Sequence, residues 1–118
     1  MTTLVLGASP NPARYSNLAI KLLRSYQHEV IAVGKKNGEV ENVPILHEFP
    51  SNKKVDTLTL YMNPENQKEY YESILALHPR RIIFNPGTEN PELEALVKEK
   101  GILTEEACTL VLLNTGQY

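Results

Sequence analysis

Short apolar runs alternate along the chain with segments whose apolar residues recur every three or four positions. The runs predicted as strands are Thr3–Leu6, Glu29–Val33, Val55–Met62, Arg81–Phe84 and, with the weakest pattern, Gly101–Leu103. Two of them contain VIAV and RIIF, which are almost continuously apolar. Such runs are typical of strands that are covered on both faces of a sheet.

Helices are predicted between these strands over residues 16–26, 64–77 and 91–100. In the first segment, apolar positions repeat at i, i+3, i+4 and i+7, which places them on one stripe facing the sheet. The stripe consists of Ala19, Leu22, Leu23 and Tyr26. The other two segments each begin with a strong start signal. Asn63 precedes Pro64 and Asn90 precedes Pro91, so each pair predicts an N-cap followed by proline at the first helical position.

Two segments have weaker patterns. Residues 34–54 are polar, with no helical period, and Val43–Leu46 is a candidate short strand among them. At the other end, TLVLL has strand composition, but Thr104 followed by two glutamates resembles a helix start. We therefore predict a final helix over residues 105–113, with Cys108 in its first turn.

Alternating strands and helices predict an α/β fold, in which right-handed crossovers place helices on both faces of a parallel sheet. The expected architecture is one Rossmann-like domain over residues 1–118, a doubly wound parallel sheet of about five strands. Ligands of such sheets bind beyond the carboxyl ends of the strands, where the winding direction reverses. The first strand usually lies at that point.

Composition narrows the class of protein further. The chain has 118 residues, 42% hydrophobic content and a net charge of −2, and its Lys and Arg residues are dispersed. This distribution argues against a nucleic-acid-binding surface. Its single cysteine cannot form an internal disulfide, and the first apolar run is too short for a signal peptide or a membrane span. A cytoplasmic location and no membrane association are expected.

The sequence after the first strand has the features of a phosphate-binding loop. It reads GASPNPARYS from Gly7 to Ser16. Gly7 leaves room for a close approach, Ser9 offers a hydroxyl, and free N–H groups at the following helix start attract phosphate. Arg14 adds a bidentate cationic donor. Ser9 and Ser16 also fit a structural role as helix caps.

This loop lacks the G-x-G-x-x-G pattern of dinucleotide-binding folds, since Ser9 and Pro12 stand at the positions of the second and third glycines. NAD-binding proteins also tend to end the second strand with an acidic residue for the ribose hydroxyls. Here Lys35 and Lys36 follow that strand. The charges favour a ribose phosphate, as in coenzyme A or NADP.

The motif GASPNPARYS resembles the opening motif of small stand-alone CoA-binding proteins, which are similar to the CoA-binding domain of the succinyl-CoA synthetase alpha subunit. The resemblance extends to chain length, VIAVGKK, VDTLTLYMNPE, the NPG after RIIF and the late cysteine. The chain departs from the family at two places. It has Val33, Gly34 and Lys35 where a valine-asparagine-proline turn is common, and Asn85 where glutamine is common.

The resemblance implies a site for coenzyme A or an acyl-CoA. The first loop would surround the pyrophosphate, the turn after strand two would meet the adenosine end, and two later strand ends would line the remaining crevice. The implied site residues are Gly7, Ala8, Ser9, Arg14, Tyr15, Ser16, Gly34, Lys35, Lys36, Met62, Asn63, Pro64, Asn85, Pro86 and Gly87.

Catalytic and metal-binding patterns are not apparent. The three histidines are isolated in the sequence, and no second cysteine accompanies Cys108. Cys108 fits either core packing or a nucleophile at a helix N-terminus. The resulting hypothesis is a CoA-binding module without complete catalytic machinery, acting as a homodimer or with a separate catalytic chain. The alternatives are an NADP-type module of a reductase and a protein-interaction domain with a decayed nucleotide site.

Overall fold

A computed structural model describes all residues, 1–118, and contains one seven-stranded sheet. The strands are β1 (Thr2–Leu6), β2 (Glu29–Val33), β3 (Glu39–Val40), β4 (Val43–Leu46), β5 (Thr57–Leu60), β6 (Arg81–Phe84) and β7 (Leu103–Glu106). Their order across the sheet is β3-β4-β2-β1-β5-β6-β7. All neighbours are parallel except β3 and β4. The expected doubly wound α/β architecture is confirmed.

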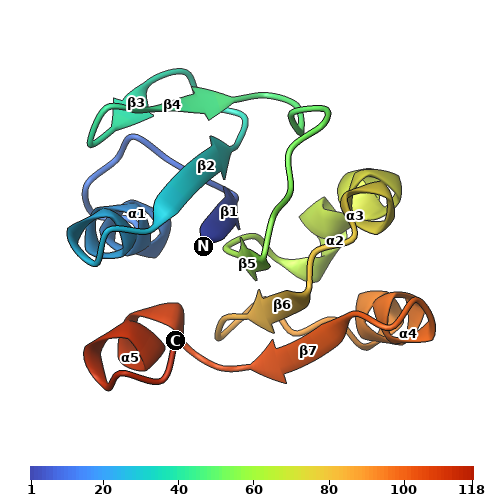
Figure 1. The fold of residues 1–118 in the computed structure, drawn as a ribbon. Coiled ribbons are helices and arrows are strands. Elements are labelled where there is room, and N and C mark those ends of the chain that lie inside the picture. The colour runs from blue at the N-terminus through green and yellow to red at the C-terminus, as the bar shows by residue number, and fades with distance from the viewer.

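Helices cover both faces of the sheet (Figure 1). They are α1 (Tyr15–Ser25), α2 (Pro64–Gln67), the 3-10 helix η1 (Lys68–Tyr70), α3 (Tyr71–Leu77), α4 (Pro91–Glu99) and α5 (Thr109–Asn114). Figure 1 shows α1 and α5 on one side of the sheet and α2, α3 and α4 on the other. The chain therefore changes face between β1, which leads into α1, and β5, which leads into α2.

Alternation along the strands divides the core in two. Leu4 and Leu6 of β1 pack in the larger cluster, on the side of α3 and α4, while Val5 packs in the other cluster with Ile20 and Leu23 of α1. These side chains are fully buried. Burying this apolar surface on both faces explains why the central strands read as nearly continuous apolar runs.

The two predicted asparagine caps are confirmed. The Asn63 side chain accepts from the N–H of Asn66, and the Asn90 side chain accepts from the N–H of Leu93, each with proline at the first helical position. The segment predicted as one helix over 64–77 is divided into α2, η1 and α3. The asparagine caps thus located the starts of α2 and α4, but they gave no sign of the break between α2 and α3.

The prediction of about five strands was wrong, because the sheet has seven. The candidate strand Val43–Leu46 is β4, which pairs with β2 in parallel through Ala32 and Val33. The additional strand is β3, a two-residue segment that pairs antiparallel with β4. Its turn places Glu41 and Asn42 in the left-handed region. So short a strand carries too few residues to show a period-2 pattern.

The prediction of a helix over residues 105–113 was wrong at its start. Thr104, Glu105 and Glu106 belong to the edge strand β7, in register with Ile82 to Phe84 of β6. Backbone pairing with β6 outweighs the local helix signal, and the half-exposed edge of the sheet tolerates glutamates. The helix α5 begins only at Thr109, with Cys108 as its N-cap instead of in its first turn.

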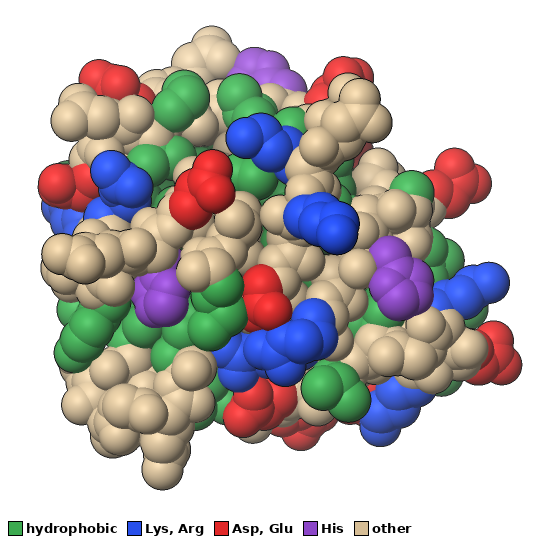
Figure 2. Space-filling view, in the orientation of Figure 1, with side chains coloured by type: hydrophobic (Ala, Val, Ile, Leu, Met, Phe, Trp, Pro, Cys, Tyr) green, Lys and Arg blue, Asp and Glu red, His purple; other side chains and the backbone are tan.

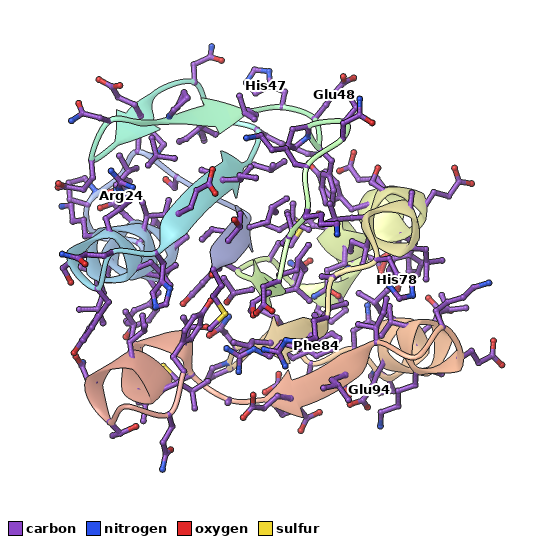
Figure 3. The ribbon with its side chains drawn as sticks, in the orientation of Figure 1. Arg24, His47, Glu48, His78, Phe84 and Glu94 are labelled. Carbon is purple, nitrogen blue, oxygen red and sulfur yellow. The ribbon has the colours of Figure 1, made fainter.

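The surface carries no extended region of one charge on the face shown in Figure 2, where acidic and basic side chains alternate. Figure 3 shows His47 beyond β4 and His78 at the end of α3, well separated in the molecule. No group of three His, Cys, Asp or Glu residues is placed to hold a metal ion. None of the helices has the length and apolarity required to cross a membrane.

Candidate functional site

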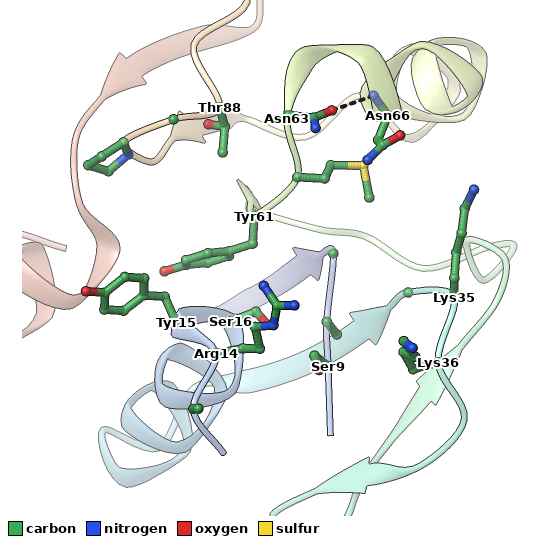
Figure 4. Close-up of a pocket in the computed structure, with 17 residues that line it drawn as sticks. Ser9, Arg14, Tyr15, Ser16, Lys35, Lys36, Tyr61, Asn63, Asn66 and Thr88 are labelled. Atoms are coloured by element: carbon green, nitrogen blue, oxygen red, sulfur yellow. Dashed lines mark hydrogen bonds between the residues drawn. The ribbon is translucent and has the colours of Figure 1, made fainter. Parts of the chain in front are cut away.

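A pocket of about 670 Å³ lies beyond the carboxyl ends of β1, β2, β5 and β6 (Figure 4). This is the edge of the sheet at which the chain changes face between β1 and β5, as expected for ligand sites in doubly wound folds. Its volume falls in the range of small-molecule and cofactor sites. The lining residues are Gly7, Ala8, Ser9, Ala13, Arg14, Tyr15, Ser16, Gly34, Lys35, Lys36, Tyr61, Met62, Asn63, Asn66, Pro86, Gly87 and Thr88.

The floor of the pocket is formed where backbone segments meet closely after β1 and β2. The N–H groups of Gly7 and Ala8 both donate to the carbonyl of Val33, at 2.8 and 3.0 Å. A Cβ on the buried Gly34 would lie 2.3 Å from the carbonyl oxygen of Ala8. Gly7 itself has a φ of +98°. Glycine is therefore required at both positions by packing or by backbone conformation.

The N-terminus of α1 opens toward this pocket. Arg14 is its N-cap but makes no side-chain capping hydrogen bond. The backbone N–H groups of Tyr15 and Ser16 have no acceptor within the protein, and neither has that of Ser9. Asn17 fixes the loop by donating from its side chain to the carbonyl of Ser9 at 3.0 Å. Helix geometry directs free N–H groups of a first turn outward along the axis, where they attract anions.

Ser9 and Ser16 do not cap α1. The Ser9 hydroxyl accepts from the N–H of Asn11 within the loop, and Ser16 lies inside the helix and is buried. The helix start is thus left without a side-chain acceptor of its own. An external anion is the natural partner of these donors.

Three cationic side chains line the pocket, and they differ in their partners. Arg14 and Lys36 are exposed and form no ion pair. The Nζ of Lys35 lies 2.6 Å from a carboxylate oxygen of Glu69. This contact raises the pKa of Lys35 above its usual value, through the hydrogen bond first and the charge of Glu69 second. Two positive charges are therefore free to meet a ligand.

A further wall of the pocket comes from the ends of β5 and β6. Tyr61 extends from the end of β5 with a buried hydroxyl that has no hydrogen-bond partner, and burial raises its pKa to about 12. The neutral phenol therefore persists at physiological pH. Thr88 is held by hydrogen bonds from its N–H and hydroxyl to the carbonyl of Asn85.

All of the site residues predicted from the sequence line this pocket except Pro64 and Asn85. Asn85 is buried below the surface, where it links β5, β6 and α5 through hydrogen bonds to Thr59, Leu60 and Thr109. Sequence reasoning missed Ala13, Tyr61, Asn66 and Thr88. Ala13, Tyr61 and Thr88 are each next to a predicted site residue in the sequence, so the loop boundaries offered a signal for these three, whereas Asn66 offered none.

Comparisons with known proteins agree with this fold. The chain is 51% identical to an uncharacterized protein of known crystal structure, with a TM-score of 0.96, and the match covers 99% of this chain and 97% of that one. A hypothetical protein from Pyrococcus horikoshii OT3 has the same fold at 24% identity, with a TM-score of 0.86 and coverage of 96% and 81%. Among curated proteins, none matches.

A larger protein contains the same fold as a part. It is a dinucleotide-forming acetyl-coenzyme A synthetase 1 from Ca. Korarchaeum cryptofilum, solved in complex with phosphate and ADP. The identity is 16% and the TM-score 0.72, over 90% of this chain and 25% of that one. At this identity the likeness concerns the fold alone. The family model described as CoA binding domain matches residues 1–114, and the chain therefore belongs to the CoA binding domain family.

Proposed function

We propose that this protein binds coenzyme A or an acyl-CoA in the pocket beyond β1, β2, β5 and β6, as a binding module without a catalytic step of its own. One observation carries the proposal. The unpaired N–H groups of Ser9, Tyr15 and Ser16 lie beside the uncompensated charge of Arg14 in one pocket. Donors and a cation in this arrangement suit a pyrophosphate.

Other parts of the pocket suit the adenosine 3′-phosphate and the pantetheine chain of coenzyme A. Lys35 and Lys36 follow β2, on the side of the pocket where an adenosine 3′-phosphate would meet them. The wall formed by Tyr61, Met62 and Pro86 offers apolar surface to the pantetheine chain. Coenzyme A, when bound, would supply a thiol for acyl transfer. The residues of this chain would hold its phosphates and leave the thiol end free for another protein.

The alternative of an NADP-type module rests on the same cations, since a 2′-phosphate carries the same charge. The two proposals are separated by titration calorimetry with CoA, 3′-dephospho-CoA, NAD and NADP. We expect CoA to bind with the highest affinity and NAD not to bind measurably. Tighter binding of NADP than of CoA would reverse the assignment, and no binding of any of these would favour an interaction domain with a decayed site.

Arg14 gives the matching test by mutation. A charge-assisted hydrogen bond contributes about 1.5–3 kcal/mol, so the exposed Arg14→Ala change is expected to weaken CoA binding about tenfold or more. Arg24, an exposed arginine in the last turn of the same helix (Figure 3), is the control. Arg24→Ala should leave the affinity within about twofold. Equal losses in both variants would refute a specific role for Arg14.

A further inference from the structure

The ion pair between Lys35 and Glu69 joins two sides of the pocket. Lys35 follows β2 and lines the pocket, whereas Glu69 lies in η1, just after the α2 segment that contributes Asn66 to the lining. Figure 4 shows the Lys35 side chain extended away from Arg14. Its Nζ lies 2.6 Å from Glu69 Oε1, and the two side chains are 67% and 53% exposed. The cation nearest the end of β2 is thus directed at a carboxylate of the protein itself.

Such a pair is easily exchanged. An ion pair between exposed side chains contributes little to stability, about 0–1 kcal/mol, because both groups remain hydrated and mobile. A phosphate monoester carries close to two negative charges and three acceptor oxygens. It is therefore a stronger partner for an ammonium group than a single carboxylate. Lys35 can turn from Glu69 to a ligand phosphate without disturbing the fold, since neither side chain is buried.

Glu69 opposes nucleotide binding in two ways. It occupies the ammonium group of Lys35, and its own negative charge repels a phosphate approaching that side of the pocket. We propose that Glu69 is an internal competitor for Lys35, so that it sets the affinity of the pocket for nucleotides that carry a phosphate on the ribose. This inference rests on the proposed function and adds a specificity-determining residue that does not line the pocket.

The test compares two acidic residues that follow one another closely in the chain. Glu69→Gln keeps the side-chain shape and removes the charge that holds Lys35. Glu65→Gln removes the same charge from α2, where Glu65 is 78% exposed and pairs with Lys68 at 3.4 Å. Calorimetry with CoA is expected to show about two- to fivefold tighter binding for Glu69→Gln, the range of an exposed ion pair. Glu65→Gln should change the affinity by less than about 1.5-fold.

A second ligand and a second variant test whether the change in CoA affinity depends on the 3′-phosphate and on Lys35. With 3′-dephospho-CoA, Glu69→Gln should bind like the wild type, because the phosphate that Lys35 would reach is missing. In a Lys35→Ala background, Glu69→Gln should tighten CoA binding clearly less than in the wild type, because only the repulsion by the Glu69 charge remains to be relieved. Thermal unfolding of each variant checks that the fold is retained.

Each contrary result has one meaning. If Glu65→Gln and Glu69→Gln tightened CoA binding equally, the gain would come from the loss of any negative charge near the pocket. That result would overturn the proposed competition for Lys35. Weaker CoA binding by Glu69→Gln would show that Glu69 positions Lys35 instead of competing for it, which also overturns it. If the wild type binds CoA and Glu69→Gln binds it with the same affinity, only the proposed competition is refuted. If the wild type binds no CoA, the proposed function itself is refuted.

Discussion

Replacing Gly34 with alanine is expected to weaken CoA binding and to destabilise the fold. The added Cβ would lie 2.3 Å from the carbonyl oxygen and 3.1 Å from the nitrogen of Ala8. Both atoms belong to backbone that Val33 also holds by hydrogen bonds, so the first loop must move as a whole. Overpacking of this kind costs about 1–3 kcal/mol of unfolding free energy or more. We expect CoA affinity to fall about tenfold or more, about 1.4 kcal/mol.

Gly101→Ala is the matched control for this prediction. Gly101 follows α4 with a φ of +79° and has open space where a Cβ would be, far from the pocket lining. Alanine there should lower stability by about 1 kcal/mol through backbone strain and leave CoA affinity unchanged. Urea unfolding and calorimetry measure both quantities. If Gly34→Ala bound CoA as tightly as Gly101→Ala, the close approach of the two loops would not shape the site.

The largest loss of stability is expected from Asn85→Leu. The side-chain amide of Asn85 donates to Thr59 at 2.6 Å and to the carbonyl of Leu60 at 2.8 Å, while its oxygen accepts from the N–H of Thr109 at 2.8 Å. Leucine has a similar size but leaves the Leu60 carbonyl and the Thr109 N–H without these partners. Each buried group left unsatisfied costs about 1–3 kcal/mol, so the expected loss is about 3 kcal/mol.

Asn66→Leu provides the comparison, because Asn66 is an exposed asparagine whose side chain makes no hydrogen bond in the protein. Its effect on unfolding free energy should stay within about 0.5 kcal/mol. Denaturant unfolding of the two variants gives the difference directly. A loss from Asn85→Leu no larger than that from Asn66→Leu would mean that the link between β5, β6 and α5 does not stabilise the sheet.

The fold was predictable where burial and local pattern agree. Strands such as Glu29–Val33 and Arg81–Phe84 are apolar on both faces and were placed with the bounds that the structure has. The edge strand β7 (Leu103–Glu106) was predicted too early, over Gly101–Leu103, because its backbone pairing with β6 is a tertiary contact that Glu105 and Glu106 do not reveal. A two-residue strand such as β3 leaves no pattern to find.

The site was predictable to the extent that strand ends define it. In a parallel sheet the carboxyl ends converge, so residues after β1, β2, β5 and β6 were expected together, and most of them line one pocket. The direction in which a loop side chain turns was not predictable. Nothing in the sequence shows that Asn85 turns inward to Thr109 or that Lys35 turns to Glu69. Such choices depend on partners distant in sequence.

The phosphates of coenzyme A are expected to bind the free N–H groups of the first loop and of the start of α1. An amide-resolved NMR titration of 15N-labelled protein with CoA tests this expectation most directly. We expect the signals of Ser9, Tyr15 and Ser16 to shift most, because their N–H groups gain an acceptor. If CoA bound while these three signals stayed in place, or if it shifted mainly the amides of Thr2 and Asp56 at the opposite end of the sheet, CoA would not bind through the start of α1.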